Sequence, residues 1–295
     1  MPAQLRVIRR RIHAVQSTQK ITRAFELISA SRVVRAQQRV EASRPYTSQI
    51  THALTSVANT EVTVSHPLLE PRAEVKAAGV LVITSDRGLA GPYNANVLRT
   101  AAELMARLQA DGVEPRLYVT GRKGVAYYRF RRRELAGSWA GFADRPDYDD
   151  AKQAADAMLE AFLDHDVDEL HMVYTDFVSM GTQRAVAQRI IPLVVEETRE
   201  RPPEPIPQYI YEPSAQAVLD ALLPRYVEAR VFTALLEAAA SEHAARRRAM
   251  KAATDNAAEL IESYTREYNQ ARQAQITQEI MEIVGGAEAL QSTGS

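Results

Sequence analysis

The chain of 295 residues contains no cysteine. This excludes disulfide bonds, cysteine-ligated zinc and thiol switches, and it fits a reducing compartment without proving one. No apolar run approaches 18 residues, so we expect no membrane-spanning helix. The N-terminal segment is basic and lacks the apolar core and cleavage site of a signal peptide. With 25% charged and 46% hydrophobic residues, the chain has the composition of a globular protein. Its length predicts about two domains.

Motifs for catalysis or cofactor binding are also missing. The sequence has no HExxH, GxSxG, GxGxxG or GxxxxGK[ST] pattern. Two glycine pairs, Gly88–Gly91 and Gly121–Gly124, follow predicted strands, where tight turns need glycine in any case. His165 and His171 flank acidic residues, but a metal site at this spacing is improbable because His171 alternates along a predicted strand. Ser85–Arg87 has no convergent histidine. We therefore expect no catalytic residue, no metal and no cofactor.

The longest regular stretch of the chain lies at its C-terminal end. From about Pro224 to Val284 there is no further proline or glycine. Sixty helical residues at about 1.5 Å each make a rod on the order of 90 Å long. A compact protein of this length is not that wide. The helix must therefore project and pair with another helix or another protein.

A second long helix is predicted at the N-terminal end, from Ala3 to about Ala58, where Pro45 is the only proline. Apolar residues follow a 3,4-spaced template at both ends of this stretch. In the middle, the template falls on Gln19, Thr22, Glu26 and Ser29, while Ile21, Phe25 and Ile28 lie one position off. This offset predicts a local change of supercoil. Pro45 predicts a bend or break. The template positions are Leu5, Ile8, Ile12, Val15, Val33, Ala36, Val40, Ile50, Leu54 and Val57.

Strands and helices alternate between the two long helices. This alternation is typical of a mostly parallel, Rossmann-like sheet with helices on its faces. A proline-rich segment, Arg201–Pro213, then predicts a stiff linker. The predicted elements are strand Ala77–Ser85, helix Ala95–Gln109, strand Arg116–Thr120, a helix after Gly121, helix Asp149–Leu163, and strands Glu169–Tyr174 and Arg189–Val195.

We expect a helical segment at 1–60, an inserted α/β domain at 75–212 and a second helical segment at 213–290. Both helices leave the same inserted domain, so they can pair only as an antiparallel coiled coil. Small residues predict a close seam on the C-terminal helix, with Leu235, Leu260 and Ile261 as larger contacts. Such a stiff pair indicates a shaft or strut more than a catalyst. The small residues are Ala238, Ala245, Ala249, Ala252 and Ala253.

The N-terminal helix is strongly basic although the net charge of the chain is only −1. Up to Pro45 there are ten lysines and arginines against two acidic residues. Together with Arg246–Arg248 and Lys251, they predict a positive collar around the shaft. Such a field attracts nucleic acid, anionic lipid or an acidic protein. Recognition elements for nucleic acid are missing, so we favour an acidic protein. The basic residues are Arg6, Arg9, Arg10, Arg11, Lys20, Arg23, Arg32, Arg35, Arg39 and Arg44.

Three separated stretches carry a resemblance to one family. The opening residues Arg9–Ile12, Ser17–Thr22 and Phe25–Ile28 resemble the start of the γ subunit of F-type ATP synthases. Ile83–Leu89 with Tyr93 and Asn94 resembles the first strand and loop of that family. The C-terminal stretches that match are Leu235–His243, Met250–Asn256, Ala271–Ile280 and Ile283–Gly286. The resemblance covers essentially the whole chain.

The resemblance implies the central rotor shaft of a bacterial proton-translocating ATP synthase, a peripheral protein at the cytoplasmic face of the cell membrane. One copy would couple rotation of the membrane c-ring to ATP synthesis or hydrolysis at the β subunits. Its implied partners are three α and three β subunits, the ε subunit and the c-ring, with no nucleic acid and no catalytic residues of its own. The chain departs from many relatives, which carry cysteine where it has Ala90. It also lacks the cysteine-bearing regulatory loop of the chloroplast form, so thiol control is not expected.

The resemblance also implies where β subunits are contacted. Glu242 and Arg246, with Lys20 and Arg23 nearby, match positions facing an acidic lever of β. A β-subunit loop is the implied partner of a second set, comprising Arg272, Gln273 and Thr277. The implied apolar tip, which would turn in an apolar sleeve, consists of Ile276, Ile280, Met281, Ile283 and Val284.

Two other classes of protein remain open. A nucleic-acid-binding coiled-coil protein is favoured by the basic helix and disfavoured by the near-neutral net charge. It would show binding that falls steeply with salt. A small α/β enzyme with dimerising helical arms would need a pocket with convergent polar groups. The loops of the predicted sheet do not indicate one.

Overall fold

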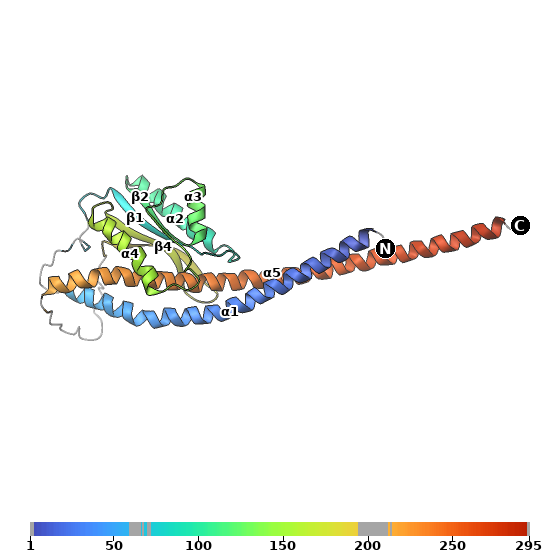
Figure 1. Cartoon of the computed structure of the whole chain (residues 1–295), viewed down its shortest axis with the longest axis horizontal. Coiled ribbons are helices and arrows are strands. Elements are labelled where there is room, and N and C mark those ends of the chain that lie inside the picture. Colours follow the sequence, from blue (N-terminus) through green and yellow to red (C-terminus); the bar gives the residue numbers. More distant parts are fainter. Residues whose placement is uncertain are drawn as a thin grey trace. The chain divides into compact units, whose positions relative to one another are not determined.

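The computed structural model describes residues 3–58, 66, 68–69, 72–193, 212 and 214–293. Helix α1 runs from Ala3 to Ala58 and helix α5 from Ala215 to Thr293. The chain divides into two compact units, one made of Met1–Ile28 with Arg247–Ser295 and the other of Ser29–Arg246. Figure 1 labels most of the elements.

The sheet in the Ser29–Arg246 unit has five strands in the order β3-β2-β1-β4-β5. β1, β2, β3 and β4 pair in parallel, and β5 is antiparallel to β4. The prediction of a mostly parallel sheet is therefore confirmed. The elements are β1 (Ala77–Ile83), α2 (Tyr93–Ala110), β2 (Glu114–Thr120), α3 (Arg122–Phe130), β3 (Gly137–Trp139), α4 (Tyr148–Leu163), β4 (Glu169–Phe177) and β5 (Gln183–Ile191).

Two strands differ from the sequence-based expectation. β5 begins at Gln183, six residues before the predicted Arg189, and it ends at Ile191. Most of this edge strand is only partly buried, so its sequence lacks the apolar run that marks a buried strand. β3 has three residues and was not predicted. The predicted linker Arg201–Pro213 lies, apart from Glu212, outside the described residues.

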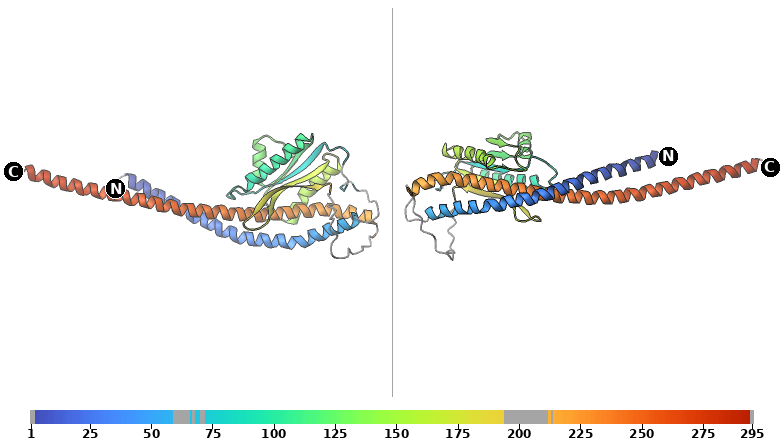
Figure 2. Two further views of the ribbon diagram at one scale, coloured as in Figure 1. Left: turned by 180° about the vertical axis from the view of Figure 1, so that it is seen from behind. Right: turned by 60° about the horizontal axis from the view of Figure 1, so that its bottom comes forward.

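Helices lie on both faces of the sheet (Figure 2). An apolar cluster fills the space on each face. On one face, alternate strand residues such as Val80 and Val82 pack with residues of α2 and α3. On the other face, Leu81 and Ile83 pack with α4 and with parts of both long helices, among them Leu54 and Leu223. The alternation of side chains along β1 explains why one strand serves both cores. The sheet is thus sandwiched between helical layers.

Both long helices continue through a proline. α1 includes Pro45, so of the predicted bend or break a break is excluded. Pro45 is exposed, and water can satisfy the carbonyl that loses its helical hydrogen bond. α5 includes Pro224 and begins at Ala215, earlier than predicted. Among the described residues, no helix combines the length and apolar character that crossing a bilayer requires.

In the Ser29–Arg246 unit, α1 and α5 pack against each other in antiparallel order. Val33 and Val40 share an apolar cluster with Leu236, Ala240 and Ala244. The hydroxyl groups of Thr47 and Thr233 lie 3.0 Å apart. Ala245, which was predicted to lie in this seam, instead packs against Ala90 and Tyr93 of the α/β layer.

The other unit, Met1–Ile28 with Arg247–Ser295, is also an antiparallel helix pair. Arg9 donates to the hydroxyl of Tyr268 at 2.6 Å, and Thr254 donates to that of Thr22 at 2.8 Å. Thr22 and Glu26 are buried in this seam, as the 3,4-spaced template requires if it continues unchanged. The seam therefore does not shift to Ile21, Phe25 and Ile28, the observation on which the predicted change of supercoil depended.

Two further residues of the predicted seam in this unit face solvent. Leu260 and Ala252 are exposed, whereas Met250 and Ala257 are buried. Ile261 is partly buried, in line with its predicted role. Large apolar side chains (Leu5, Ile8 and Met250) and small or polar ones (Ala257, Thr22 and Glu26) therefore share this interface.

Candidate functional site

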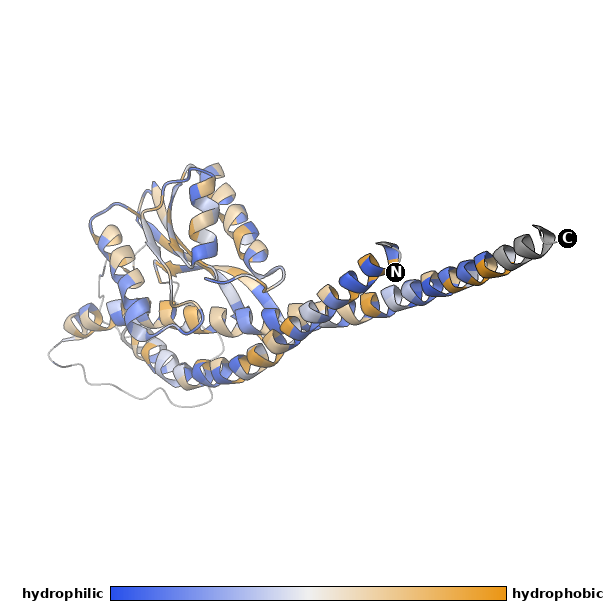
Figure 3. Ribbon diagram, turned by 45° about the vertical axis from the view of Figure 1, so that its right-hand side comes forward, coloured by the Kyte–Doolittle hydropathy of each residue, from blue (hydrophilic) through white to orange (hydrophobic). Residues whose placement is uncertain are grey.

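The last turns of α5 present apolar side chains to solvent. Ile276, Ile280, Ile283 and Val284 follow each other at helical spacing and share one face of the helix. All of them are exposed, Ile283 to 72%, and Met281 beside them is exposed as well. Figure 3 shows apolar bands recurring along this part of α5. The described residues leave this apolar face uncovered, and such faces are typical of surfaces that bind another protein or a membrane.

This part of α5 is supported as a helix by its own side chains. Gln275 donates to Glu279 at 2.6 Å, and Gln278 donates to Glu282 at 3.0 Å. Pairs four residues apart each stabilise an isolated helix by about 0.2–0.5 kcal/mol. Arg272, Gln273 and Thr277 lie on the same segment and are all exposed. The exposure that the predicted contact with a β loop requires is therefore present at these three residues.

A second exposed surface lies on α1 around Lys20 and Arg23. Both side chains are exposed, and Arg23 forms an ion pair of 2.8 Å with the buried Glu26. Beside them an apolar stripe, Ile21, Phe25 and Ile28, also faces solvent. Sequence reasoning assigned this stripe to a shifted seam and so missed it as a surface. The feature of the sequence that could have revealed this surface is that its three residues lie one position off the 3,4-spaced template.

Glu242 and Arg246 occupy a different environment, in the Ser29–Arg246 unit. Glu242 is 1% exposed, and Arg246 is also buried. Arg246 donates to the Glu242 carboxylate and, from Nε and Nη2, to the Gly88 carbonyl oxygen at 3.2 Å each. An Asp144 carboxylate oxygen lies 4.0 Å from its Nη1. Arg246 therefore does not contribute to an exposed positive collar, which corrects that part of the sequence-based prediction.

Burial dominates the ionisation of this cluster. It raises the pKa of Glu242 to about 7, against the opposing effect of Arg246. It also lowers the pKa of His243 to about 4, and the ring of His243 lies 3.1 Å from the Asp144 carbonyl oxygen. Near neutral pH the arginine is thus the fixed charge, and it holds the Gly88 loop against α5.

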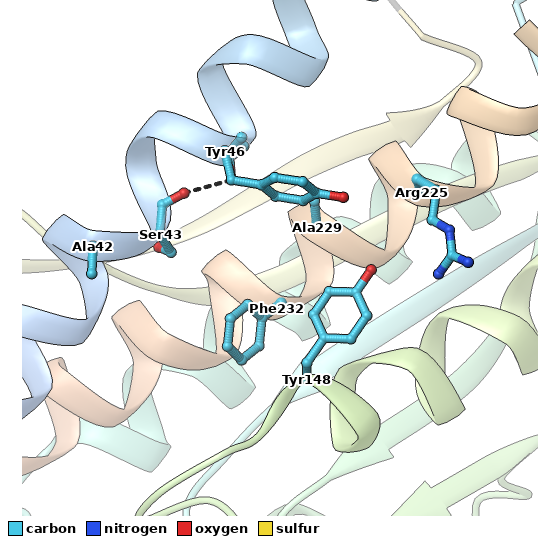
Figure 4. A pocket seen from close by; sticks show the side chains of 8 residues that line it. Ala42, Ser43, Tyr46, Tyr148, Arg225, Ala229 and Phe232 are labelled. Carbon is cyan, nitrogen blue, oxygen red and sulfur yellow. Dashed lines mark hydrogen bonds between the residues drawn. The ribbon is translucent and has the colours of Figure 1, made fainter. Parts of the chain in front are cut away.

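A surface pocket of about 490 Å³ lies between α1, α5 and the start of α4 (Figure 4). Tyr148 donates to Glu228 at 2.5 Å, and Arg225 donates to the same carboxylate at 2.9 Å. Burial and this hydrogen bond raise the pKa of Tyr148 to about 12. Tyr148 and Arg225 thus share the Glu228 carboxylate as their acceptor. Its lining residues are Ala42, Ser43, Tyr46, Thr47, Tyr148, Arg225, Ala229 and Phe232.

The residues weighed as possible catalytic or metal-binding groups have structural partners. The ring of His171 lies 2.9 Å from Glu169. Asp86 accepts from the backbone N–H groups of Arg122, Gly141 and Ala143, which braces two loops. Among the described residues, no group of three histidines or carboxylates is placed to hold a metal ion.

The glycine at the end of β2 supports a turn rather than a phosphate loop. Gly121 has a φ of +90°, and a Cβ atom there would lie 2.2 Å from the Thr84 carbonyl oxygen. Both facts require glycine at this position. The sequence-based interpretation of Gly121 as a turn residue is confirmed.

Comparisons with known proteins agree along the whole chain. A family profile described as "ATP synthase" matches residues 4–290. The "ATP synthase gamma chain" of Acidothermus cellulolyticus is 60% identical over 300 residues and covers 100% of both chains. The protein of the same name from Saccharopolyspora erythraea is 57% identical and covers 99% of both.

Solved structures add a likeness of fold. A chain from the Euglena gracilis mitochondrial ATP synthase, a structure of OSCP, F1 and c-ring, aligns with a TM-score of 0.68 at 17% identity, covering 99% of this chain and 96% of that one. A chain from the central stalk and c-ring of the Tetrahymena thermophila mitochondrial ATP synthase aligns with a TM-score of 0.57 at 20% identity, covering 79% and 99%.

Proposed function

Because the chain belongs to the family of ATP synthase gamma chains, we propose that it is the central rotor shaft of a bacterial F-type ATP synthase. One copy stands inside a ring of three α and three β subunits and contacts the ε subunit and the membrane c-ring. Rotation of the c-ring, driven by the coupling ion, turns the shaft and drives ATP synthesis at the β subunits. The reverse reaction, ATP hydrolysis, turns it the other way.

The observation that carries the proposal is the uncovered apolar face at the end of α5. Ile276, Ile280, Ile283 and Val284 need a surrounding apolar surface, and apolar contacts have no preferred direction. A sleeve of other subunits supplies such a surface and lets the helix turn without breaking a fixed set of hydrogen bonds. An isolated monomer would leave this face in water.

The lack of internal symmetry in the shaft supports a coupling role. A single chain inside a three-fold ring meets each β subunit with a different face. Rotation then changes which face each β subunit meets, and differential contact shifts the nucleotide sites among their states. The shaft needs no catalytic residues of its own for this task. We place it at the cytoplasmic face of the cell membrane as a peripheral protein.

We propose that the exposed residues contact the β subunits. Lys20 and Arg23 are suited to an acidic segment of β, and Arg272, Gln273 and Thr277 are suited to hydrogen bonds with a β loop. Glu242 and Arg246 reach a β subunit only if the Gly88 loop opens. In the closed arrangement they act on that interface by fixing the loop.

The test is co-assembly of the full chain with the α and β subunits of the same organism. The expected result is one copy in a three-plus-three complex with ATPase activity. Arg272→Ala with Gln273→Ala, or Ile276→Ser with Ile280→Ser and Ile283→Ser, should lower that activity at least about tenfold, the effect of about 1.4 kcal/mol. Gln278→Ala, on the same segment, is the matched control and should retain it.

Failure to associate with α and β subunits would overturn the proposal. The favoured alternative would then be the nucleic-acid-binding coiled coil, which predicts binding to DNA or RNA that falls steeply with salt.

A further inference from the structure

The C-terminal end of α3 carries a cluster of arginines around one phenylalanine. Phe130 is 90% exposed. Arg129, Arg131, Arg132 and Arg133 are exposed as well, and the exposed Glu134 follows them directly in the sequence. We call these five residues the α3 tip. None of the four arginines forms an ion pair with a residue that the structure describes.

The backbone holds the α3 tip in a fixed turn. Arg132 adopts a φ of +54°, in the left-handed region. The backbone N–H of Arg133 donates to the backbone carbonyl oxygen of Tyr128 at 3.0 Å. The backbone N–H of Arg132 donates to the carbonyl oxygen of Arg129, also at 3.0 Å. This double hydrogen bond is the Schellman ending of a helix, whose left-handed position is usually glycine. An arginine there adds charge where glycine would stabilise the fold better.

The base of the α3 tip is anchored in the protein interior. Tyr128 belongs to the buried cluster beneath α3, and Tyr127 packs edge-on against it at 5.1 Å. Arg131 lies over the Tyr127 ring at 4.0 Å from its centroid. The anchored base therefore presents Phe130 and the cationic groups outward in a preformed arrangement.

Helix stabilisation explains only part of this pattern. Cations near a helix C-terminus interact favourably with the helix dipole, but the effect falls off within the last turn. Arg132 and Arg133 lie beyond the last helical residue, Phe130. An exposed phenylalanine contributes nothing to such an effect. Four cations around one apolar ring instead match the composition of surfaces that lie in a membrane interface.

We propose that the α3 tip binds the anionic headgroup surface of a phospholipid bilayer, with Phe130 entering the boundary between headgroups and acyl chains. The inference rests on the proposed function, because that function places the protein beside a membrane. A diffuse negative surface suits four exposed arginines that form no ion pair with a described residue. A nucleic-acid site would instead offer several aromatic rings along a basic groove.

Partition of the full-length chain into vesicles tests this proposal. Vesicles of phosphatidylcholine mixed with phosphatidylglycerol should bind the chain at about 0.1 M salt, and pure phosphatidylcholine should not. Replacing Arg131, Arg132 and Arg133 by glutamine should weaken binding at least about tenfold, because each arginine near the surface contributes about fivefold. The matched control replaces Arg9, Arg10 and Arg11 by glutamine and removes the same charge. Equal or greater loss in that control would overturn the proposal.

Insertion of residue 130 has its own readout. Trp139 is the one tryptophan of the sequence, so Phe130→Trp in a Trp139→Phe background gives a single fluorophore. Its emission should shift to the blue and be quenched by brominated acyl chains in anionic vesicles. Phe130→Ser should weaken partition, and Phe130→Leu should retain it. Unchanged emission of Trp at this position would overturn the proposal.

Two additional measurements separate the alternatives. Inorganic phosphate at millimolar concentration should not displace the chain from vesicles, and displacement would indicate an ion site instead. Binding of the α3 tip to RNA or to an acidic protein without vesicle binding would also overturn the proposal. The tip variants should still assemble with α and β subunits. Wild-type chain that binds vesicles through the tip but fails to assemble would contradict the proposed function and leave this inference standing.

Discussion

Arg246 donates to the carboxylate of Glu242 one helical turn earlier, and both side chains are almost completely buried. Because both side chains are buried, water cannot replace either partner if the other is removed. Arg246 thus links the buried acid to the Gly88 loop, because it also donates to the Gly88 carbonyl oxygen.

Arg246→Ala is expected to destabilise the fold strongly. It leaves Glu242 buried without its cation, and removing one partner of a buried pair costs about 3–5 kcal/mol. The loss should be smaller at pH 6 than at pH 8, because the pKa of Glu242 is raised to about 7 and the protonated acid needs no cation. Urea unfolding at both pH values measures this. Lys251→Ala, at an exposed residue, is the control, and a loss below about 1 kcal/mol for Arg246→Ala would contradict the burial argument.

Two glycines with positive φ should respond differently to alanine. Gly121 has a φ of +90° and no room for a Cβ, whereas Gly112 has a φ of +81° and open space around it. Gly112→Ala should cost about 1 kcal/mol, the penalty of the left-handed conformation alone. Gly121→Ala should cost several times more, because the Thr84 carbonyl must also move. Thermal unfolding of both variants compares them, and equal costs would rule out the predicted clash.

Glu237 should make stability fall as pH rises from about 4.5 to 7. Burial, reinforced by nearby Asp176, raises the pKa of Glu237 to about 7. The folded state therefore binds more protons than the unfolded state in this range, and the stability linked to this proton is lost as pH rises through the folded pKa. Glu237→Gln should gain about 1–2 kcal/mol relative to wild type at pH 8 and little at pH 4.5. Denaturant titration at both values measures the difference, and a gain independent of pH would refute the assignment.

The helix pair of the Met1–Ile28 unit should discriminate between two isoleucines. Ile8 is buried in the seam, whereas Ile21 is 57% exposed. Ile8→Ser should destabilise the pair by about 2 kcal/mol or more, and Ile21→Ser by less than about 0.5 kcal/mol. Helix content followed by circular dichroism during thermal unfolding reports the difference. The opposite order would restore the shifted seam that the apolar pattern alone predicts.

The α/β layer was largely predictable because strands and helices there carry distinct local patterns. Val80, Leu81 and Val82 form a continuous apolar run since β1 is buried on both faces. β5 escaped accurate prediction because an antiparallel edge strand needs little apolar sequence, and β3 because three residues carry no period.

The candidate binding surfaces were harder to predict for a physical reason. An apolar residue off the template, such as Phe25, has the same pattern whether the seam shifts or the residue faces solvent. Only packing distinguishes the two, and packing placed Thr22 and Glu26 inside. Likewise, nothing local distinguishes Arg246, which is buried, from the exposed Arg247 and Arg248 that follow it in the sequence.

The antiparallel direction of β5 has a consequence for how such a chain can be rearranged. β1 begins level with the start of β4, and β5 ends level with the same point, two strand spacings or about 10 Å away. The chain thus enters the sheet at the start of β1 and leaves it at the end of β5, and both points lie at the same end of the strands. A block with adjacent ends can be gained or removed by a single recombination event. The sheet layer therefore has the geometry of a domain inserted between α1 and α5, with its first and last strands meeting at one end of the sheet.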